Sequence, residues 1–276
     1  MKQRLASLQH FWLKLKFILE YSTHLQTDNN PPLELIFKFI HGLDKKDFKK
    51  VYKKFNQTEI SKKIFDQDVA VLDKIMQGKF KPKTFGYEFQ AWLKKSEGAV
   101  DIFKFSYPGK DHTKLGKFFK ETIMQHDLIH FLNGYDTTPL AEVGVLSFNL
   151  AKEWRESYAT ILYSSFFMSI RNTFLPSKYP SGVRWYLLLK YSPIAVYLRV
   201  VSEGWKRGKK SPWLLTIDWE KYLHVDLTKV KEELFLENDP KYWLDVQPIW
   251  KKTLKRYKEY AKDYSNRTTT TDRGEV

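Results

Sequence analysis

The stretch that decides the fold is residues 125–142, which read QHDLIHFLNGYDTTPLAE. Its first part has the apolar spacing of an α-helix. Gly134 follows, and glycine is the residue type that ends helices at a positive φ. Thr138 and Pro139 then predict the start of a second helix, because threonine caps helix N-termini and proline fits the first helical position. The short connection predicts two antiparallel, neighbouring helices.

This predicted hairpin brings potential metal ligands together. His126 and His130 are four residues apart, so both rings project from one face of the first helix. Glu142 falls in the first turn of the second helix, where it can face the two imidazoles. Asp127 lies on the flank of the same face, where it is either a further ligand or a carboxylate that orients a ring. Nitrogen and oxygen ligands without sulfur favour Zn, Fe or Mn.

Other readings of this spacing stay open. Two histidines of a buried helix face with satisfied hydrogen bonds fit the spacing about as well as a metal site does. An HExxH protease needs a glutamate after the first histidine, and Asp127 at that position is too short for the role. An HD phosphohydrolase needs further ligands, which Asp111 and His112 could supply.

The rest of the chain has the same helical period, which predicts an all-α fold with a single multi-helix domain. Proline and glycine divide it into helical runs, which span about 32–41, 44–56, 59–77, 84–95, 113–132, 139–172, 181–206, 226–236 and 240–264. Residues 100–107 are the one candidate for a strand. We expect a basic amphipathic extension at 1–30, the helical domain at 31–237, and a basic helix with a polar tail at 238–276.

Composition narrows the class of protein. The 276 residues include 42% hydrophobic residues, enough for a core, and no cysteine, which excludes disulfides, iron–sulfur clusters and thiol nucleophiles. No window reaches the roughly 18 apolar residues of a membrane-spanning helix. The net charge of +15 fits nucleic acid, an anionic membrane surface or acidic substrates. We expect no nucleic-acid partner, because zinc-finger, RNP and GxxG motifs are absent.

The pattern HDxxH, eleven residues and then Glu resembles the signature of the coenzyme Q (ubiquinone) biosynthesis family Coq-four. The resemblance covers about residues 32–236 and includes flanking blocks, which are TFGYEF at 84–89, GYDT at 134–137 and EGWKRG at 203–208. Two features depart from the family pattern. Ala141 replaces a usual glycine before Glu142, and residues 120–125 lack the arginines usually found before HDxxH.

The resemblance implies an all-helical, dimeric, membrane-associated protein that works with other quinone-biosynthesis enzymes on a prenylated precursor. It implies removal of the ring C1 carboxylate, coupled to hydroxylation there. It also implies a divalent metal, Zn before Fe, Mn or Mg, at the positions of His126, Asp127, His130 and Glu142, with Asp127 acting on protons. The expected location is the cytoplasmic face of an inner membrane, or the mitochondrial matrix side in a eukaryote. The alternatives are a prenyl-lipid-binding scaffold without catalysis and a metallohydrolase of an isoprenoid phosphate.

Two further sets of residues complete the predicted sites. Asn149 and Glu153 continue the stripe of Glu142 along its helix and are candidates to support the metal ligands. The candidates for a prenyl-tail groove are Leu146, Phe148, Leu162, Phe166 and Phe167. The candidates for contact with a membrane or another anion are Trp205, Lys206, Arg207, Lys209 and Lys210, because Trp beside Lys and Arg suits lipid headgroups.

Overall fold

The computed structural model describes residues 45–67, 70–96, 113–174, 193–236, 240 and 242–243. Within these ranges the regular elements are α-helices and short 3-10 helices, and one isolated β-bridge joins Thr84 to Asp226. The predicted all-α class is therefore confirmed. No helix in the described part of the chain is both long and apolar enough to span a bilayer.

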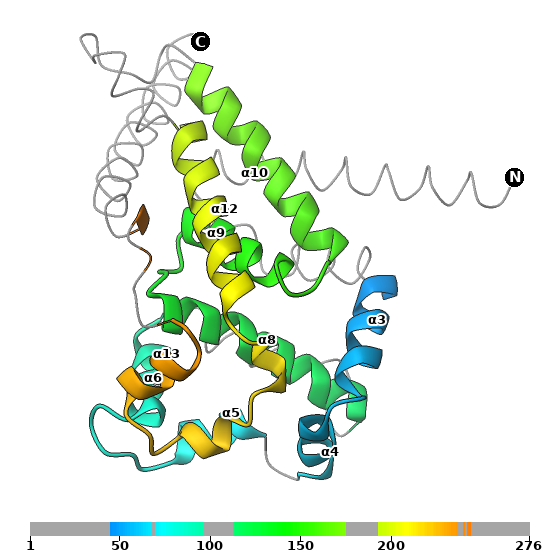
Figure 1. Ribbon diagram of the computed structural model, residues 1–276, viewed down its shortest axis with the longest axis vertical. Helices are drawn as coiled ribbons and strands as arrows, with labels where there is room; N and C mark the ends of the chain where they lie inside the picture. The colour runs from blue at the N-terminus through cyan, green and yellow to red at the C-terminus, as the bar shows by residue number, and fades with distance from the viewer. Residues whose placement is uncertain are drawn as a thin grey trace, which may run out of the picture.

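The helices form two groups on either side of a central one (Figure 1). Helix α8 crosses the middle of the molecule, with α9, α10 and α12 packed together on one side and α5, α6 and α13 on the other. The bounds are α3 Lys45–Phe55, α4 Glu59–Asp66, α5 Val71–Gln77, α6 Phe85–Lys95, α8 Lys114–Asn133, α9 Pro139–Leu150, α10 Glu156–Phe174, α12 Pro193–Lys210, η2 Leu214–Thr216, η3 Trp219–Tyr222 and α13 Leu227–Glu233.

The largest hydrophobic core joins both groups through α8. Its buried side chains include Phe89 of α6, Leu128 of α8 and Val200 of α12, each with no exposed surface. Trp243 belongs to the same core and is equally buried, so the core reaches past residue 237. A smaller cluster around Phe118 packs α3 and α4 against the start of α8. The ligand-bearing hairpin is therefore held by packing on several sides.

Local residue types fix the ends of the two hairpin helices. The Thr113 hydroxyl accepts a hydrogen bond from the Gly116 N–H and caps α8, while Gly134 ends α8 with φ of 65°. Pro139 opens α9 as predicted. Thr138 occupies the N-cap position, but its hydroxyl bonds to the Asp136 carboxylate, at 2.6 Å, and does not cap the helix.

Two predicted helices are each divided in the structure, and polar contacts with distant residues accompany both breaks. The run predicted at 139–172 divides into α9 and α10, where the carboxylate of Glu153 pairs with Arg155 at 2.6 Å and accepts the indole N–H of Trp213. The run predicted at 59–77 divides into α4 and α5, where the Lys117 ammonium binds the backbone carbonyl of Gln67. Neither break has a proline or glycine to signal it.

Helices α9 and α12 approach so closely that glycine is required at two positions. A Cβ atom on Gly204 would lie 2.3 Å from the carbonyl oxygen of Gly144, and one on Gly208 would lie 2.3 Å from the carbonyl oxygen of Phe148. Only residues without a Cβ permit this backbone contact. The contact fixes the position of α9, whose first turn carries Glu142.

Several predictions fall on residues outside the described ranges. They are the amphipathic extension at 1–30, the helical run at 32–41, the strand candidate at 100–107, the alternative ligands Asp111 and His112, residues 181–192 of the run predicted at 181–206 and, apart from residues 240 and 242–243, the helix and tail at 238–276.

Candidate metal centre

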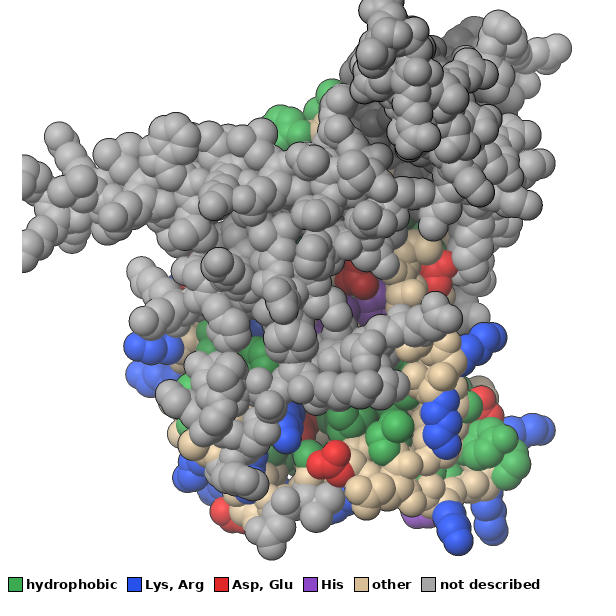
Figure 2. All heavy atoms as spheres, turned by 180° about the vertical axis from the view of Figure 1, so that it is seen from behind, with side chains coloured by type: hydrophobic (Ala, Val, Ile, Leu, Met, Phe, Trp, Pro, Cys, Tyr) green, Lys and Arg blue, Asp and Glu red, His purple; other side chains and the backbone are tan. Residues whose placement is uncertain are grey.

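The structure brings His126, His130 and Glu142 together between α8 and α9. The His126 Nε2 lies 3.1 Å from one carboxylate oxygen of Glu142, and the His130 Nε2 lies 3.0 Å from the other. One potential ligand atom from each of the three residues lies within 4.8 Å of the other two. Histidine and acidic side chains are visible together near the middle of the face seen from behind (Figure 2).

The three donors fit a divalent ion by their chemistry, and they lie close enough together to converge on one. Zinc bonds nitrogen at about 2.0–2.1 Å and oxygen at about 2.0–2.2 Å, so a tetrahedral edge between them is about 3.3 Å long. The two N···O distances end on different oxygens of Glu142, and the three ligand atoms lie within 4.8 Å of one another, so the side chains would draw closer together around a bound ion. Three protein ligands also leave one position for a substrate or water, which is the pattern of catalytic zinc sites.

Asp127 has a different position from the other three residues. Its Oδ1 lies 3.2 Å from the His126 Nδ1, on the side of the ring away from Glu142. Its Oδ2 is buried and has no hydrogen-bond partner in the part of the chain that the structure describes. A hydrogen on Nδ1 that is shared with Asp127 leaves Nε2 as the ring nitrogen that a metal ion would bind. This geometry is that of a carboxylate that orients an imidazole.

Burial and aromatic packing restrict His130 more than His126. The His130 side chain is 2% exposed, against 24% for His126. The Trp92 ring of α6 stacks on the His130 ring with 6.3 Å between centroids, and the two imidazoles lie 4.8 Å apart. His130 is therefore enclosed by protein, and solvent or a substrate can reach the site from the His126 side.

The histidines and carboxylates of the site shift one another's pKa toward the charged forms. Burial on its own would lower the pKa of His126, but the carboxylates of Glu142 and Asp127 outweigh it and raise that pKa to about 10. Burial would raise the pKa of Glu142, yet His130 and His126 hold it far below its usual value. The metal-free arrangement is thus a carboxylate held between two imidazoles.

The two predicted supporting residues on the Glu142 stripe are both buried. Asn149 accepts a hydrogen bond of 2.7 Å from the Gln125 amide, which ties α9 to α8 one residue before His126. Glu153 is 7% exposed and is paired with Arg155, so it holds the loop after α9 and is not a solvated charge. Sequence reasoning missed Gln125 and Trp92, because neither residue type has a spacing that marks it.

The prenyl-tail candidates divide between the core and the surface. Leu146 and Phe148 are buried within hydrophobic clusters, at 5% and 1% exposure. Leu162 and Phe166 are partly buried against the core, whereas Phe167 is 60% exposed. The five residues do not share one surface, so no groove formed by all of them exists.

The membrane or anion candidates lie mostly on the surface of the last turns of α12. Trp205 is 38% exposed, and Lys206, Lys209 and Lys210 are exposed. The Lys209 ammonium lies 5.6 Å from the centroid of the Trp205 ring. Arg207 is half-buried and donates a hydrogen bond from Nε to the side-chain oxygen of Asn133 at the end of α8. This bond links α12 to the helix that carries the two histidines.

Similarity to known proteins places the chain in a family. The family model for the coenzyme Q (ubiquinone) biosynthesis protein Coq4 matches residues 44–240. The chain belongs to the Coq4 family. No curated protein sequence matches it significantly.

One similar solved structure shows that the Coq4 chain shares its fold with a protein from another organism. It is the 2.85 Å crystal structure of a protein from Nostoc punctiforme named as a candidate ubiquinone biosynthesis protein. The TM-score is 0.56 at 15% identity, with 83% of this chain and 97% of that chain covered. The family match covers both hairpin helices, so the candidate metal centre lies inside the Coq4 region.

Proposed function

We propose that this Coq4 family member is a metal-dependent enzyme of quinone biosynthesis that removes the C1 carboxylate of a polyprenylated hydroxybenzoate. The single observation that supports the proposal is the convergence of two imidazoles and one carboxylate at 3.0 and 3.1 Å. A divalent ion bound there, zinc first and iron, manganese or magnesium as alternatives, supplies Lewis-acid stabilisation of negative charge on substrate oxygens.

The side chains of the site have separate tasks in this proposal. His126, His130 and Glu142 hold the ion. Asp127 orients the His126 ring through Nδ1 and so sets which ring nitrogen binds the ion, and the proton that it shares with that ring is the proton source in this proposal. Trp92 covers His130 and excludes water from that side of the site.

The prenyl tail needs an apolar surface near the site. Of the five candidates, Phe166 and Phe167 on α10 are the ones with exposed ring surface, and their rings pack 5.9 Å apart. Tyr163, one turn earlier on α10, is 61% exposed. We place the tail along this side of α10.

Contact with an anionic membrane surface is part of the same proposal, because a prenylated substrate resides in lipid. Lys54 of α3, Lys152 after α9 and Lys209 of α12 lie close together: the Lys152 ammonium donates to the Lys209 carbonyl at 3.2 Å, and burial and then the charges of Lys54 and Lys209 lower the pKa of Lys152. Trp154, two residues after Lys152, and Trp205, which lies under the Lys209 ammonium, are 60% and 38% exposed. Tryptophan beside lysine is the composition of a headgroup-binding surface.

The decisive experiment measures bound metal and turnover on the same preparations. Wild type, His130→Ala and the control His224→Ala, a histidine packed on Phe80 in another part of the fold, are analysed by plasma mass spectrometry. Each is then assayed for labelled carbon dioxide from a carboxyl-labelled prenylated hydroxybenzoate. We expect about one equivalent of metal and turnover in wild type and His224→Ala, and neither in His130→Ala.

Other results would select among the alternatives. Metal without turnover would favour a prenyl-lipid-binding scaffold that organises other quinone-biosynthesis enzymes. Release of inorganic phosphate from an isoprenoid phosphate would favour a metallohydrolase. Folded wild type and folded His130→Ala that both lack metal after incubation with zinc would make the two histidines ordinary buried residues. Light scattering of the same samples tests the expected homodimer.

A further inference from the structure

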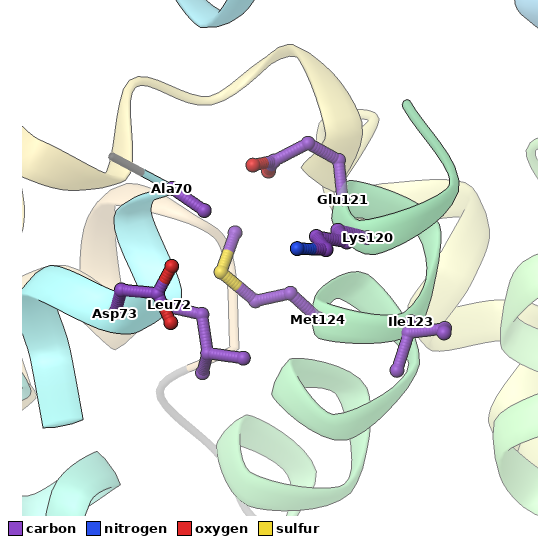
Figure 3. A pocket seen from close by; sticks show the side chains of 7 residues that line it. All are labelled: Ala70, Leu72, Asp73, Lys120, Glu121, Ile123 and Met124. Atoms are coloured by element: carbon purple, nitrogen blue, oxygen red, sulfur yellow. The ribbon is translucent and has the colours of Figure 1, made fainter. Parts of the chain in front are cut away.

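A small pocket lies between α5 and α8, away from the candidate metal centre (Figure 3). Its volume is about 50 Å³, enough for a few water molecules or a short aliphatic group. The lining residues are Ala70, Leu72, Asp73, Lys120, Glu121, Ile123 and Met124. Glu121 precedes His126 by five positions, which places it about 140° around α8 from that histidine. The pocket is thus separate from the metal centre.

Glu121 is the unusual residue of this pocket. It is 5% exposed, it points into the pocket in Figure 3, and no described residue forms a hydrogen bond or ion pair with it. Burial, and then the negative charge of Glu220, raises its pKa to about 8. The lysines near Glu220 are already engaged, since Lys63 binds Asp218 and Glu220 at 2.7 and 2.8 Å, and Lys74 binds Glu220.

A buried carboxyl group in such a position must keep its proton or acquire a positive partner. The residues that line the pocket determine which kind of cation fits. Leu72, Ile123 and Met124 are apolar, and Asp73 adds one exposed carboxylate. Calcium takes 6–8 oxygen ligands and magnesium about six, so a bare divalent ion is poorly served here. An aliphatic ammonium ion places its N–H donors on the carboxylate and its methylene groups on the apolar walls.

We propose that this pocket binds the ammonium end of a small aliphatic amine, with Glu121 as its counter-ion. Lys120 lines the same pocket, and its positive charge opposes such a ligand. The site is independent of the metal centre and of the proposed decarboxylation.

The test uses the full chain labelled with carbon-13 at the methionine methyl groups and titrated with propylammonium chloride. The chain has four methionines, so the Met124 methyl signal is assigned by comparison with Met124→Leu. We expect a saturable shift of this signal in wild type. Glu121→Gln should weaken binding at least tenfold, and Lys120→Met should strengthen it severalfold. Circular dichroism verifies that both variants are folded.

Two comparisons make the test specific for charge pairing. Propanol has the same apolar group without charge and should not saturate the site. Binding of propylammonium should strengthen about tenfold from pH 6 to pH 7, because the carboxyl group must release one proton for each ligand bound. Equal binding of propanol, unchanged binding in Glu121→Gln, affinity independent of pH, or no shift in wild type would each overturn the proposal.

Discussion

Replacing Gly204 with alanine tests whether the contact between α9 and α12 positions the ligand helices. The added Cβ would lie 2.3 Å from the carbonyl oxygen of Gly144, and ordinary contact begins at 3.4 Å. Because the obstacle is backbone, one helix must move by about 1 Å, a shift that a packed interior resists. Gly144 is two residues from Glu142, so the movement should reach the candidate metal centre.

The cost can be worked out from two opposing effects. Overpacking of a core costs about 1–3 kcal/mol, and a backbone obstacle belongs in the upper part of this range. Alanine recovers about 1 kcal/mol through its better helix propensity. The net loss is therefore about 1–2 kcal/mol, which lowers the melting temperature by about 2–8 °C for a domain of this size.

The assay compares thermal unfolding and bound metal in Gly204→Ala and Ser202→Ala. Ser202 is exposed on the same helix, so its replacement should leave both properties unchanged. We expect Gly204→Ala to melt several degrees lower and to retain less metal after dialysis. A melting temperature within 1 °C of that of Ser202→Ala would refute the reasoning, because it would mean that α9 and α12 separate without cost.

Three further predictions concern stability. Burial raises the pKa of Glu121 from about 4.5 in the unfolded chain to about 8 in the folded protein, so this residue destabilises the fold progressively as the pH rises between these values. The free energy of unfolding of Glu121→Gln in urea should therefore equal that of wild type at pH 4 and exceed it by about 2–5 kcal/mol at pH 8. Glu153→Gln, which breaks the buried pair with Arg155, should cost about 3–5 kcal/mol by the same assay. Trp243→Ala should cost about 3–5 kcal/mol, whereas Trp154→Ala, at a 60% exposed side chain, should cost less than about 1 kcal/mol; equal losses in these two variants would contradict the assigned burial.

The hairpin was predictable because its signals are local. The spacing of His126 and His130, Gly134 after the helix and Pro139 at the start of the next one each act within a few residues. These signals were enough to predict α8, the start of α9 and the meeting of Glu142 with the two imidazoles. The all-α class followed from the same helical period.

The rest depends on residues that are distant in the sequence. The break between α9 and α10 lies at a contact between Glu153 and Trp213, which are 60 residues apart. The cover of His130 comes from Trp92 on another helix. A helical pattern reports which face is apolar, but it does not report which partner fills that face. The division of the prenyl-tail candidates between core and surface has this origin.

The short turn at Gly134 also has a kinetic consequence. His126 and Glu142 are 16 residues apart, whereas the hydrogen bond from the Trp243 indole to the Gly134 carbonyl, 3.1 Å long, closes a loop of 109 residues. Loop-closure entropy makes the second contact about 2 kcal/mol more costly to form from the unfolded chain. The metal ligands can therefore meet early in folding, and the Trp243 indole forms its hydrogen bond to the Gly134 carbonyl afterwards.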